Sequence, residues 1–343
     1  MTQPIRRRAV EPGRLLDLIE GFRGLKVAVF GDLIVDEFIY GEISRVSREA
    51  PVLILNYAST EIVPGGAGDA ANNVAALGGS PMIVGLAGRD DAGRRMLASL
   101  KRGVDVTGIV RPVGHLTPMK TRILAGGVHS AKQQVVRIDR VSPSAVSDGD
   151  RRAVESRLLK TAARCDALLV SDYGAGLVAP ALVSSARRRI SARKRVPVLV
   201  DSRYALLRFR TMTACTPNES EVEQLFNIRI GENLRLLERA GRDLLRHTRA
   251  QAVLITRGSR GMALFEPERP TTHIPIHGSD QIADVTGAGD TVIATMTLAL
   301  AAGGTFVEAA SLANYAGGLV VMKRGTATVS ADELRIAVLS DVD

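Results

Sequence analysis

Residues 282–304, IADVTGAGDTVIATMTLALAAGG, place one carboxylate, Asp290, between a glycine-rich turn and a run of uncharged residues. The run predicts a buried helix that begins near residue 290. The first amide groups of a helix lack intrahelical partners, and its N-terminus carries positive partial charge, so this turn suits an anion. Two interpretations of Asp290 follow: it caps the helix, or it works beside a phosphate held by the turn.

Outward from this stretch, strand-like apolar runs alternate with helical patterns along most of the chain. Strands are expected at 25–31, 81–88, 167–174, 197–201, 213–218 and 252–258, and helices at 68–79, 90–104, 148–164, 180–194, 219–226, 232–248, 290–302 and 307–322. Alternation of this kind predicts an α/β protein with a doubly wound, mostly parallel sheet that is covered by helices on both faces.

Two further segments, about 34–63 and 118–138, have the pattern of paired β-strands, the second with a turn near Gly126 and Gly127. They are not crossover units, so we expect them to form a small β lid beside the main sheet. The sequence contains no internal repeat and no Pro- or Ser-rich linker. We therefore expect one domain over 25–335, with an N-terminal extension at 1–24 and a C-terminal tail at 336–343.

Composition narrows the classes of function. The chain has 343 residues, and 45% of them are hydrophobic. Its two cysteines, Cys165 and Cys215, lie too far apart in the sequence for a metal-binding motif, and they suggest no disulfide framework. No secretory signal or membrane span is evident, which predicts a soluble, cytoplasmic protein. The net charge of +9 comes from scattered arginines, and with 3% aromatic residues and no Trp we expect neither a nucleic-acid nor a membrane partner. A positive field would instead attract anionic substrates.

Polar side chains follow several of the expected strands: Asp32, Asp36, Asp172, Asp201, Asn218, Glu221 and Thr256. Each alone is most simply a cap or turn residue, but open α/β sheets bind ligands beyond the carboxyl ends of their strands. P-loop and dinucleotide-binding motifs are absent. The turn before Asp290 nevertheless supplies backbone amides for a transferring phosphoryl group, with Asp290 placed to accept a hydroxyl proton.

The segments PGGAGDAANNVAALG (64–78) and DVTGAGDTV (284–292) closely resemble the two signatures of the ribokinase-like (PfkB) sugar kinases. Further segments are similar to heptose 7-phosphate kinases of that family: 31–52, 132–140, 168–176, 216–221, 256–262 and 313–330. The resemblance covers roughly 25–335 and implies a doubly wound domain with a β lid. It also implies ATP and Mg²⁺ as cofactors and phosphoryl transfer to a sugar hydroxyl.

The resemblance assigns roles to individual residues. It implies Asp290 as the catalytic base, with an anion-binding turn of Gly287, Ala288 and Gly289. On the nucleotide side it implies Asn218, Glu221, Thr256, Gly258, Gly261 and Asn314, with Glu221 tied to Mg²⁺. On the sugar side it implies Asp32, Asp36, Arg45, Gly65, Gly66, Asp69, Lys120, Arg137, Asp172 and Arg203. Asp284 and Thr286 match a site for a monovalent cation such as K⁺, and the strand at 53–57 offers an edge for a homodimer.

The sequence also departs from the family pattern on the sugar side. Asp69 stands where relatives carry Asn, Ala175 where heptose kinases carry Lys, and Ser202-Arg203 where they carry Pro-Lys. A carboxylate only accepts hydrogen bonds, and arginine is not a neutral replacement for lysine. A heptose 7-phosphate is the first expected acceptor. The alternatives are a different sugar or sugar phosphate, or a catalytically silent sugar-binding regulatory relative. A nucleoside kinase would need more aromatic residues.

Overall fold

The body of the protein is a nine-stranded sheet in a computed structural model that describes residues 10–126, 132–141, 146–191, 196–278, 284–323 and 325–341. The strand order is β13-β12-β11-β10-β9-β8-β1-β4-β5. The strands are β1 (Lys26–Gly31), β4 (Ser80–Leu86), β5 (Asp105–Val110), β8 (Ala167–Asp172), β9 (Val198–Ser202), β10 (Ala214–Cys215), β11 (Ala252–Thr256), β12 (Met262–Phe265) and β13 (Thr272–Ile274). All pairings are parallel except those of β12 with β11 and β13.

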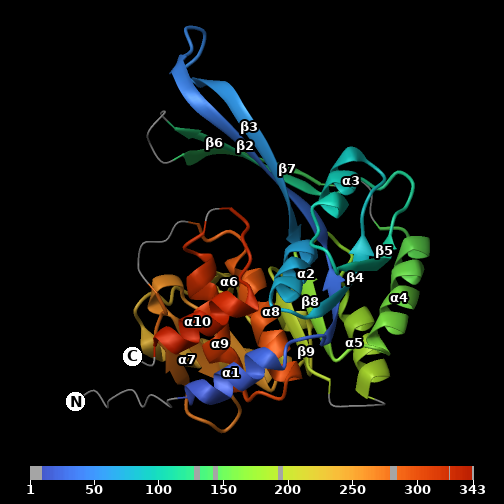
Figure 1. Ribbon diagram of the computed structural model, residues 1–343, viewed down its shortest axis with the longest axis vertical. Helices are drawn as coiled ribbons and strands as arrows, with labels where there is room; N and C mark the ends of the chain where they lie inside the picture. The colour runs from blue at the N-terminus through green and yellow to red at the C-terminus, as the bar shows by residue number, and fades with distance from the viewer. Residues whose placement is uncertain are drawn as a thin grey trace.

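Two layers of helices cover the sheet because successive strand residues point to opposite faces. Val27 and Val29 of β1 lie in one apolar cluster, and Ala28 and Phe30 lie in the other. The first cluster includes α1 (Pro12–Glu20), α2 (Ala67–Ala76), α8 (Ala288–Ala301), α9 (Phe306–Val320) and α10 (Ala331–Ser340). The second includes α4 (Asp148–Ala162), α5 (Pro180–Ser191), α6 (Glu219–Phe226) and α7 (Leu234–Thr248). Figure 1 shows this arrangement, which confirms the predicted α/β fold class.

Helix α8 is the buried helix that the opening stretch predicts. Every residue from 290 to 299 is buried, and the helix packs against α2 and α9. Its threonines do not leave polar groups unpaired, since the hydroxyls of Thr295 and Thr297 donate to the carbonyls of Thr291 and Ile293. A helix with no charge after Asp290 can therefore lie inside the core, and its N-terminus is held in a fixed place.

The β lid is a separate four-stranded sheet in the order β3-β2-β6-β7. Its strands are β2 (Leu33–Val46), β3 (Leu53–Gly66), β6 (Met119–Gly126) and β7 (Gln133–Arg140). In Figure 1 the long β2–β3 hairpin projects away from the body beside β6 and β7. Short helix α3 (Asp91–Ala98) contacts the base of the hairpin. Gly126 ends β6, while Gly127, the second residue of the expected turn, lies outside the described residues.

The chain ends differ from the expected extension and tail. Leu15, Leu18, Ile19 and Phe22, in and after α1, are buried in the main core, and α1 packs against α10. Helix α10 and strand β5 were not expected, and the strand expected at 213–218 is only the two-residue β10. Residues 1–9 and 342–343 lie outside the description. Among the described helices, none is both long and apolar enough to span a membrane.

Candidate active site

A cavity of about 500 Å³ lies at the carboxyl ends of the central strands, between the body and the lid. It is lined from the body by residues that follow β8, β9, β10 and β11, and from the lid by residues of β2, β3, β6 and β7. Most of the residues singled out in the sequence meet here: Asp36, Gly65, Asp69, Lys120, Arg137, Asp172, Arg203, Asn218, Glu221, Thr256, Gly258, Gly261, Thr286, Gly287, Ala288, Gly289, Asp290 and Asn314. Of the seven polar residues noted after the expected strands, all but Asp32 line this cavity.

Four of the singled-out residues do not line the cavity: Asp32, Arg45, Gly66 and Asp284. Asp32 is buried, and its Oδ2 accepts the backbone amides of Tyr173 (2.9 Å) and Ala175 (3.0 Å), so it holds the turn after β8. Arg45 is exposed on the outer half of β2. It lies nine residues beyond Asp36, about 30 Å along an extended strand. Neither residue is among those that line the cavity.

Gly66 and Asp284 shape the backbone beside the cavity. Gly66 has a φ of 58°, and a Cβ there would lie 2.5 Å from the Asp32 carbonyl oxygen and 3.4 Å from the Tyr173 ring. Asp284 accepts the amides of Thr286 (2.9 Å) and Gly325 (3.2 Å), which ties together the loops before α8 and after α9.

Asp290 lies at the start of α8 but does not cap it. The N-cap is Gly287, which has a φ of 80°, and Asp290 is the third residue of the helix. Its Oδ2 accepts a hydrogen bond of 2.9 Å from the hydroxyl of Tyr173, and the residue is only 3% exposed. The structure therefore excludes the interpretation that Asp290 caps the helix. Asp290 is instead a buried carboxylate in the wall of the cavity.

The environment of Asp290 raises its pKa to about 7. Burial is the main cause, and the nearby Asp36 carboxylate acts in the same direction. The Tyr173 hydroxyl and the Lys120 ammonium oppose the shift because they favour the charged form. A carboxylate with a pKa near neutrality is suited to accept a proton from a hydroxyl group.

The turn before Asp290 presents free backbone amides. The amides of Gly289 and Asp290 have no acceptor among the described residues, as expected for the first turn of a helix. Gly289 has no atom within 4 Å of the position that a Cβ would take, so the approach to these amides is open. Together with the helix dipole they form a site for an anion next to the Asp290 carboxylate.

The lid side of the cavity combines carboxylates with cations. Asp36 is 7% exposed and pairs with Arg122 on the neighbouring strand β6. Lys120, also on β6, has its ammonium group 4.7 Å from the centre of the Tyr173 ring, and burial lowers its pKa. Arg137 on β7 lines the cavity while its guanidinium holds Asp139 at 2.8 Å. Hydroxyl groups and a phosphate would both find partners here.

Ser202 and Arg203, which depart from the family pattern, have defined places beside the cavity. The Ser202 hydroxyl donates to Asp172 Oδ2 at 2.6 Å and accepts the amide of Ala205 at 3.1 Å. The Arg203 amide donates to the Asp172 carbonyl at 3.0 Å, and its guanidinium favours the charged forms of Asp201 and Glu221. Ala175 is exposed and lies outside the cavity wall. The Ser-Arg pair thus orients Asp172 and adds a cation to the site.

The part of the cavity where the resemblance places the nucleotide begins at the N-terminus of α6. Asn218 and Glu221 form a reciprocal capping box, with both side chain-to-amide bonds at 2.9 Å. Burial raises the pKa of Glu221 and of neighbouring Asp201, and the Glu221 charge raises that of Asp201 further. Two adjacent carboxylates that disfavour each other's charge fit a divalent cation, which Mg²⁺ typically binds through one or two carboxylates, phosphates and waters.

Beyond α6 the cavity becomes more apolar. Met262, Ile276, Val292 and Val321 line it next to Thr256, Gly258, Gly261 and Asn314. The Asn314 side-chain amide donates to the Pro275 carbonyl at 2.9 Å, which fixes the segment after β13 against α9. This part of the wall suits the flat apolar surface of a nucleobase.

Sequence reasoning missed Tyr173 and Arg122 as site residues, and it noted Asp201 only as a strand-end acid. Tyr173 is 117 residues from its partner Asp290, and Arg122 is 86 residues from Asp36. For Tyr173 the available signal was its position in SDYG, directly after a strand that ends in Asp172.

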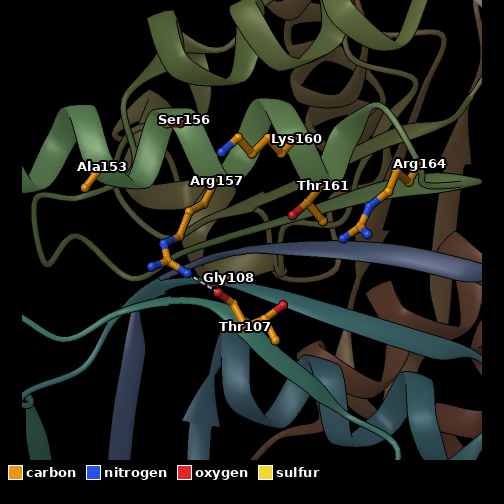
Figure 2. A pocket seen from close by; sticks show the side chains of 8 residues that line it. All are labelled: Thr107, Gly108, Ala153, Ser156, Arg157, Lys160, Thr161 and Arg164. Atoms are coloured by element: carbon orange, nitrogen blue, oxygen red, sulfur yellow. Dashed lines mark hydrogen bonds between the residues drawn. The ribbon is translucent and has the colours of Figure 1, made fainter.

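A second cavity of about 460 Å³ lies between α4 and the edge strand β5 (Figure 2). It is lined by Thr107, Gly108, Ala153, Ser156, Arg157, Lys160, Thr161 and Arg164. These residues include three cations and no carboxylate, and none of them lines the first cavity. Of these two cavities, the one under the lid is therefore the one whose described lining contains carboxylates.

Comparison with known proteins gives a consistent result. Residues 25–333 match the model of a family described as pfkB family carbohydrate kinase. The bifunctional protein HldE of Geobacter metallireducens is 38% identical over 314 residues, which cover 91% of this chain and 62% of that protein. HldE of Geobacter sulfurreducens is 40% identical over 315 residues, which cover 90% of this chain and 62% of that protein. The chain thus spans less than two thirds of the length of these relatives.

Solved structures show the same fold at low sequence identity. Phosphofructokinase-2 from Escherichia coli, in complex with substrates and products, superposes with a TM-score of 0.74 at 19% identity, over 93% of this chain and 100% of that one. A ribokinase from Arabidopsis thaliana, complexed with ribose and ATP, gives a TM-score of 0.68 at 21% identity, over 93% of this chain and 98% of that one. The resemblance inferred from the two sequence signatures is confirmed.

Proposed function

The chain belongs to the pfkB family of carbohydrate kinases, and on that premise we propose that it transfers the γ-phosphoryl group of ATP to the 1-hydroxyl of a heptose 7-phosphate. The observation that carries the proposal is the buried Asp290 carboxylate, which lies beside free amides at the N-terminus of α8 and faces the cavity. A proton acceptor and an anion site at one place are what phosphoryl transfer to a hydroxyl requires.

Asp290 orients the acceptor hydroxyl and accepts its proton as the oxygen attacks the γ-phosphorus. The amides of Gly289 and Asp290, with the positive end of α8, stabilise the charge on the transferring phosphoryl group. Mg²⁺ held near Glu221 and Asp201 would neutralise triphosphate charge. The apolar wall around Met262 and Val292 would hold the adenine, and the lid would exclude water over the sugar.

The acceptor is proposed from the charges around the lid side of the cavity. Asp36 and Asp172 supply acceptors for sugar hydroxyls, whereas Lys120, Arg137 and Arg203 supply cations in addition to Arg122, which pairs with Asp36. Three cations beside hydroxyl acceptors favour a sugar that already carries a phosphate over a neutral sugar. The heptose within that class comes from the sequence resemblance to heptose 7-phosphate kinases.

The test is ADP release from Mg·ATP across a panel of sugars and sugar phosphates that includes D-glycero-D-manno-heptose 7-phosphate. We expect turnover on the heptose phosphate and a loss of about 10²–10⁴-fold in Asp290→Asn. Asp91→Asn, which changes an exposed acid on α3, is the matched control and should keep full activity. Turnover on another sugar alone would overturn the acceptor, and full activity in Asp290→Asn would overturn the role of the base.

We also propose a monovalent cation at the loop of Asp284 and Thr286. Each Asp284 oxygen accepts one backbone amide from the described residues, and a carboxylate oxygen can accept from a donor and bind a cation at the same time. A potassium complex is known for Escherichia coli phosphofructokinase-2. Higher turnover in KCl than in NaCl at equal ionic strength, lost in Asp284→Ala, would support the site, and equal rates would contradict it.

The lid carries the surface proposed for a homodimer. Apolar side chains are exposed along the outer halves of β2 and β3 and in the connection between them: Ile43, Val46, Val52, Leu53 and Tyr57, with exposures between 42% and 70%. A second copy of this chain would cover them. Sedimentation velocity should show a dimer that Leu53→Lys dissociates, whereas Val113→Lys, at a residue already 84% exposed, should leave it intact. A monomeric wild-type chain would contradict the proposal.

A further inference from the structure

Asp69, the acid that stands where relatives carry Asn, lies at the catalytic turn itself. It is the third residue of α2, is 2% exposed, and lines the cavity. Its Oδ2 lies beside Gly287, because a Cβ on that glycine would be 2.7 Å from this oxygen. The Asp290 carboxylate is close enough that its charge raises the pKa of Asp69. Two carboxyl groups therefore meet where the phosphoryl group is to be transferred.

The remaining hydrogen bonds of this pair leave one oxygen of each group without a protein donor. Asp69 Oδ1 accepts the side-chain amide of Asn73 at 3.2 Å, and Asp290 Oδ2 accepts the hydroxyl of Tyr173 at 2.9 Å. Asp69 Oδ2 and Asp290 Oδ1 are buried and have no donor among the described residues. Two ionised carboxylates in this arrangement would leave two charged oxygens unpaired. A single proton between the groups satisfies both.

The partners decide which group keeps the proton. Tyr173 and the Lys120 ammonium favour a charged Asp290. Asp69 receives one longer hydrogen bond from the Asn73 side-chain amide. The side-chain carbonyl of Asn73 accepts a hydrogen bond of 2.8 Å from the Thr291 hydroxyl. Burial, followed by the charges of Asp290 and Asp36, raises the pKa of Asp69 well above its ordinary value. The charged or titratable groups that face the pair are Asp36 from β2, Lys120 from β6, Tyr173 after β8 and Asp201 from β9.

We propose that Asp69 is protonated in the active enzyme and donates a hydrogen bond to Asp290, which makes it a positioning residue for the base. The inference rests on the proposed kinase function and deepens it. A neutral carboxyl group can both donate and accept a hydrogen bond, as the family's Asn amide can. Asp69 therefore replaces Asn in function as well as in shape, and the first-turn geometry of α8 is kept.

The test is the pH dependence of kcat/KM for the wild type, Asp69→Asn and Asp69→Ala at saturating Mg·ATP. Asp69→Asn keeps a donor without adding charge, so the midpoint of the acid limb should stay within about 0.5 pH unit. Asp69→Ala removes the donor, so the midpoint should rise by about one unit and kcat should fall about tenfold. If Asp69→Asn lowers the midpoint by a unit or more, Asp69 is charged in the active enzyme and the proposal is wrong.

A second readout does not depend on activity. Infrared spectra of the wild type at pH 7.5 should contain a carboxylic acid C=O band that is absent from Asp69→Asn, and circular dichroism should show that both are folded. The band should persist in Asp91→Asn, which changes an exposed carboxylate. Loss of the band without turnover on any acceptor would sustain the proton assignment and refute the kinase proposal. Turnover on a sugar, together with a band that survives in Asp69→Asn, would support the kinase proposal and refute the assignment of the proton to Asp69.

Discussion

At the scale of single residues, Asp290 links activity to a cost in stability. Its pKa is raised from 3.8 to about 7, so folding favours the protonated form. The stability that this group contributes is complete below its unfolded pKa and is lost as the pH rises through 7. The carboxylate form, which the proposed role as a base requires, is thus the form that the fold disfavours.

Asp290→Asn should therefore be more stable than the wild type at alkaline pH. A shift of about three pKa units corresponds to roughly 4 kcal/mol in the free energy of unfolding at pH 8, and the difference should vanish near pH 4. Urea denaturation at both pH values measures it. The exposed Asp91→Asn should show no such pH-dependent gain, and an equal gain at pH 4 and pH 8 would contradict the argument.

Tyr173 lowers the pKa of Asp290, so the effect of replacing it can be predicted. Its hydroxyl stabilises the charged form of Asp290, so Tyr173→Phe should raise the pKa of the base. We expect the acid limb of the rate profile to move to higher pH, and kcat at pH 7 to fall by about tenfold. Tyr57→Phe, at a residue 70% exposed on the lid, should change neither quantity. An unchanged acid limb in Tyr173→Phe would show that the hydroxyl does not act on Asp290.

At the scale of elements, the two glycines of the turn before Asp290 differ in what they require. Gly287 has a φ of 80°, and its Cβ would lie 2.7 Å from Asp69 Oδ2 and 3.0 Å from Thr326 Cγ2. Gly289 is the second residue of α8, and a Cβ there meets nothing within 4 Å. Glycine is required at 287 because of the positive φ and the crowded Cβ position, whereas at 289 it leaves space for a ligand.

Gly287→Ala should lower the free energy of unfolding by about 1–3 kcal/mol because alanine is strained at this φ and crowds Asp69. Gly289→Ala should leave it unchanged or raise it by up to about 1 kcal/mol, since alanine favours the helix. Chemical denaturation of the two variants, with no ligand added, provides the comparison. Equal destabilisation of both would contradict the distinction.

At the scale of the whole molecule, helix α1 is part of the core. Leu18 is 1% exposed, and it lies with Leu15, Ile19 and Phe22 against the layer that contains α8. Leu18→Ala should cost about 2–5 kcal/mol in the free energy of unfolding. Ile336→Ala on α10, at a residue 65% exposed, should cost no more than about 0.5 kcal/mol. A Leu18→Ala variant as stable as the control would mean that α1 is dispensable.

The same helix shows where sequence reasoning stops. Local patterns predicted the sheet, the lid, the strand-end acids and the Gly-Ala-Gly-Asp turn, whereas most of the other cavity-wall residues were named from the family resemblance. The spacing of Leu15, Leu18, Ile19 and Phe22 also had the helical pattern, but nothing local indicates what such a stripe packs against. Contacts between Tyr173 and Asp290, or Arg122 and Asp36, join distant strands and helices. Their chemistry depends on the assembled sheet.

The long hairpin of the lid has a consequence for how such an enzyme can diversify. Asp36 and Gly65 lie at its root, while the exposed Ile43, Leu53 and Tyr57 lie toward its tip. With the roles proposed for these residues, mutations near the tip would alter assembly and leave the chemistry untouched, whereas mutations at the root would change acceptor binding without altering the tip. Selection can therefore act on the two properties independently, although one pair of strands encodes both.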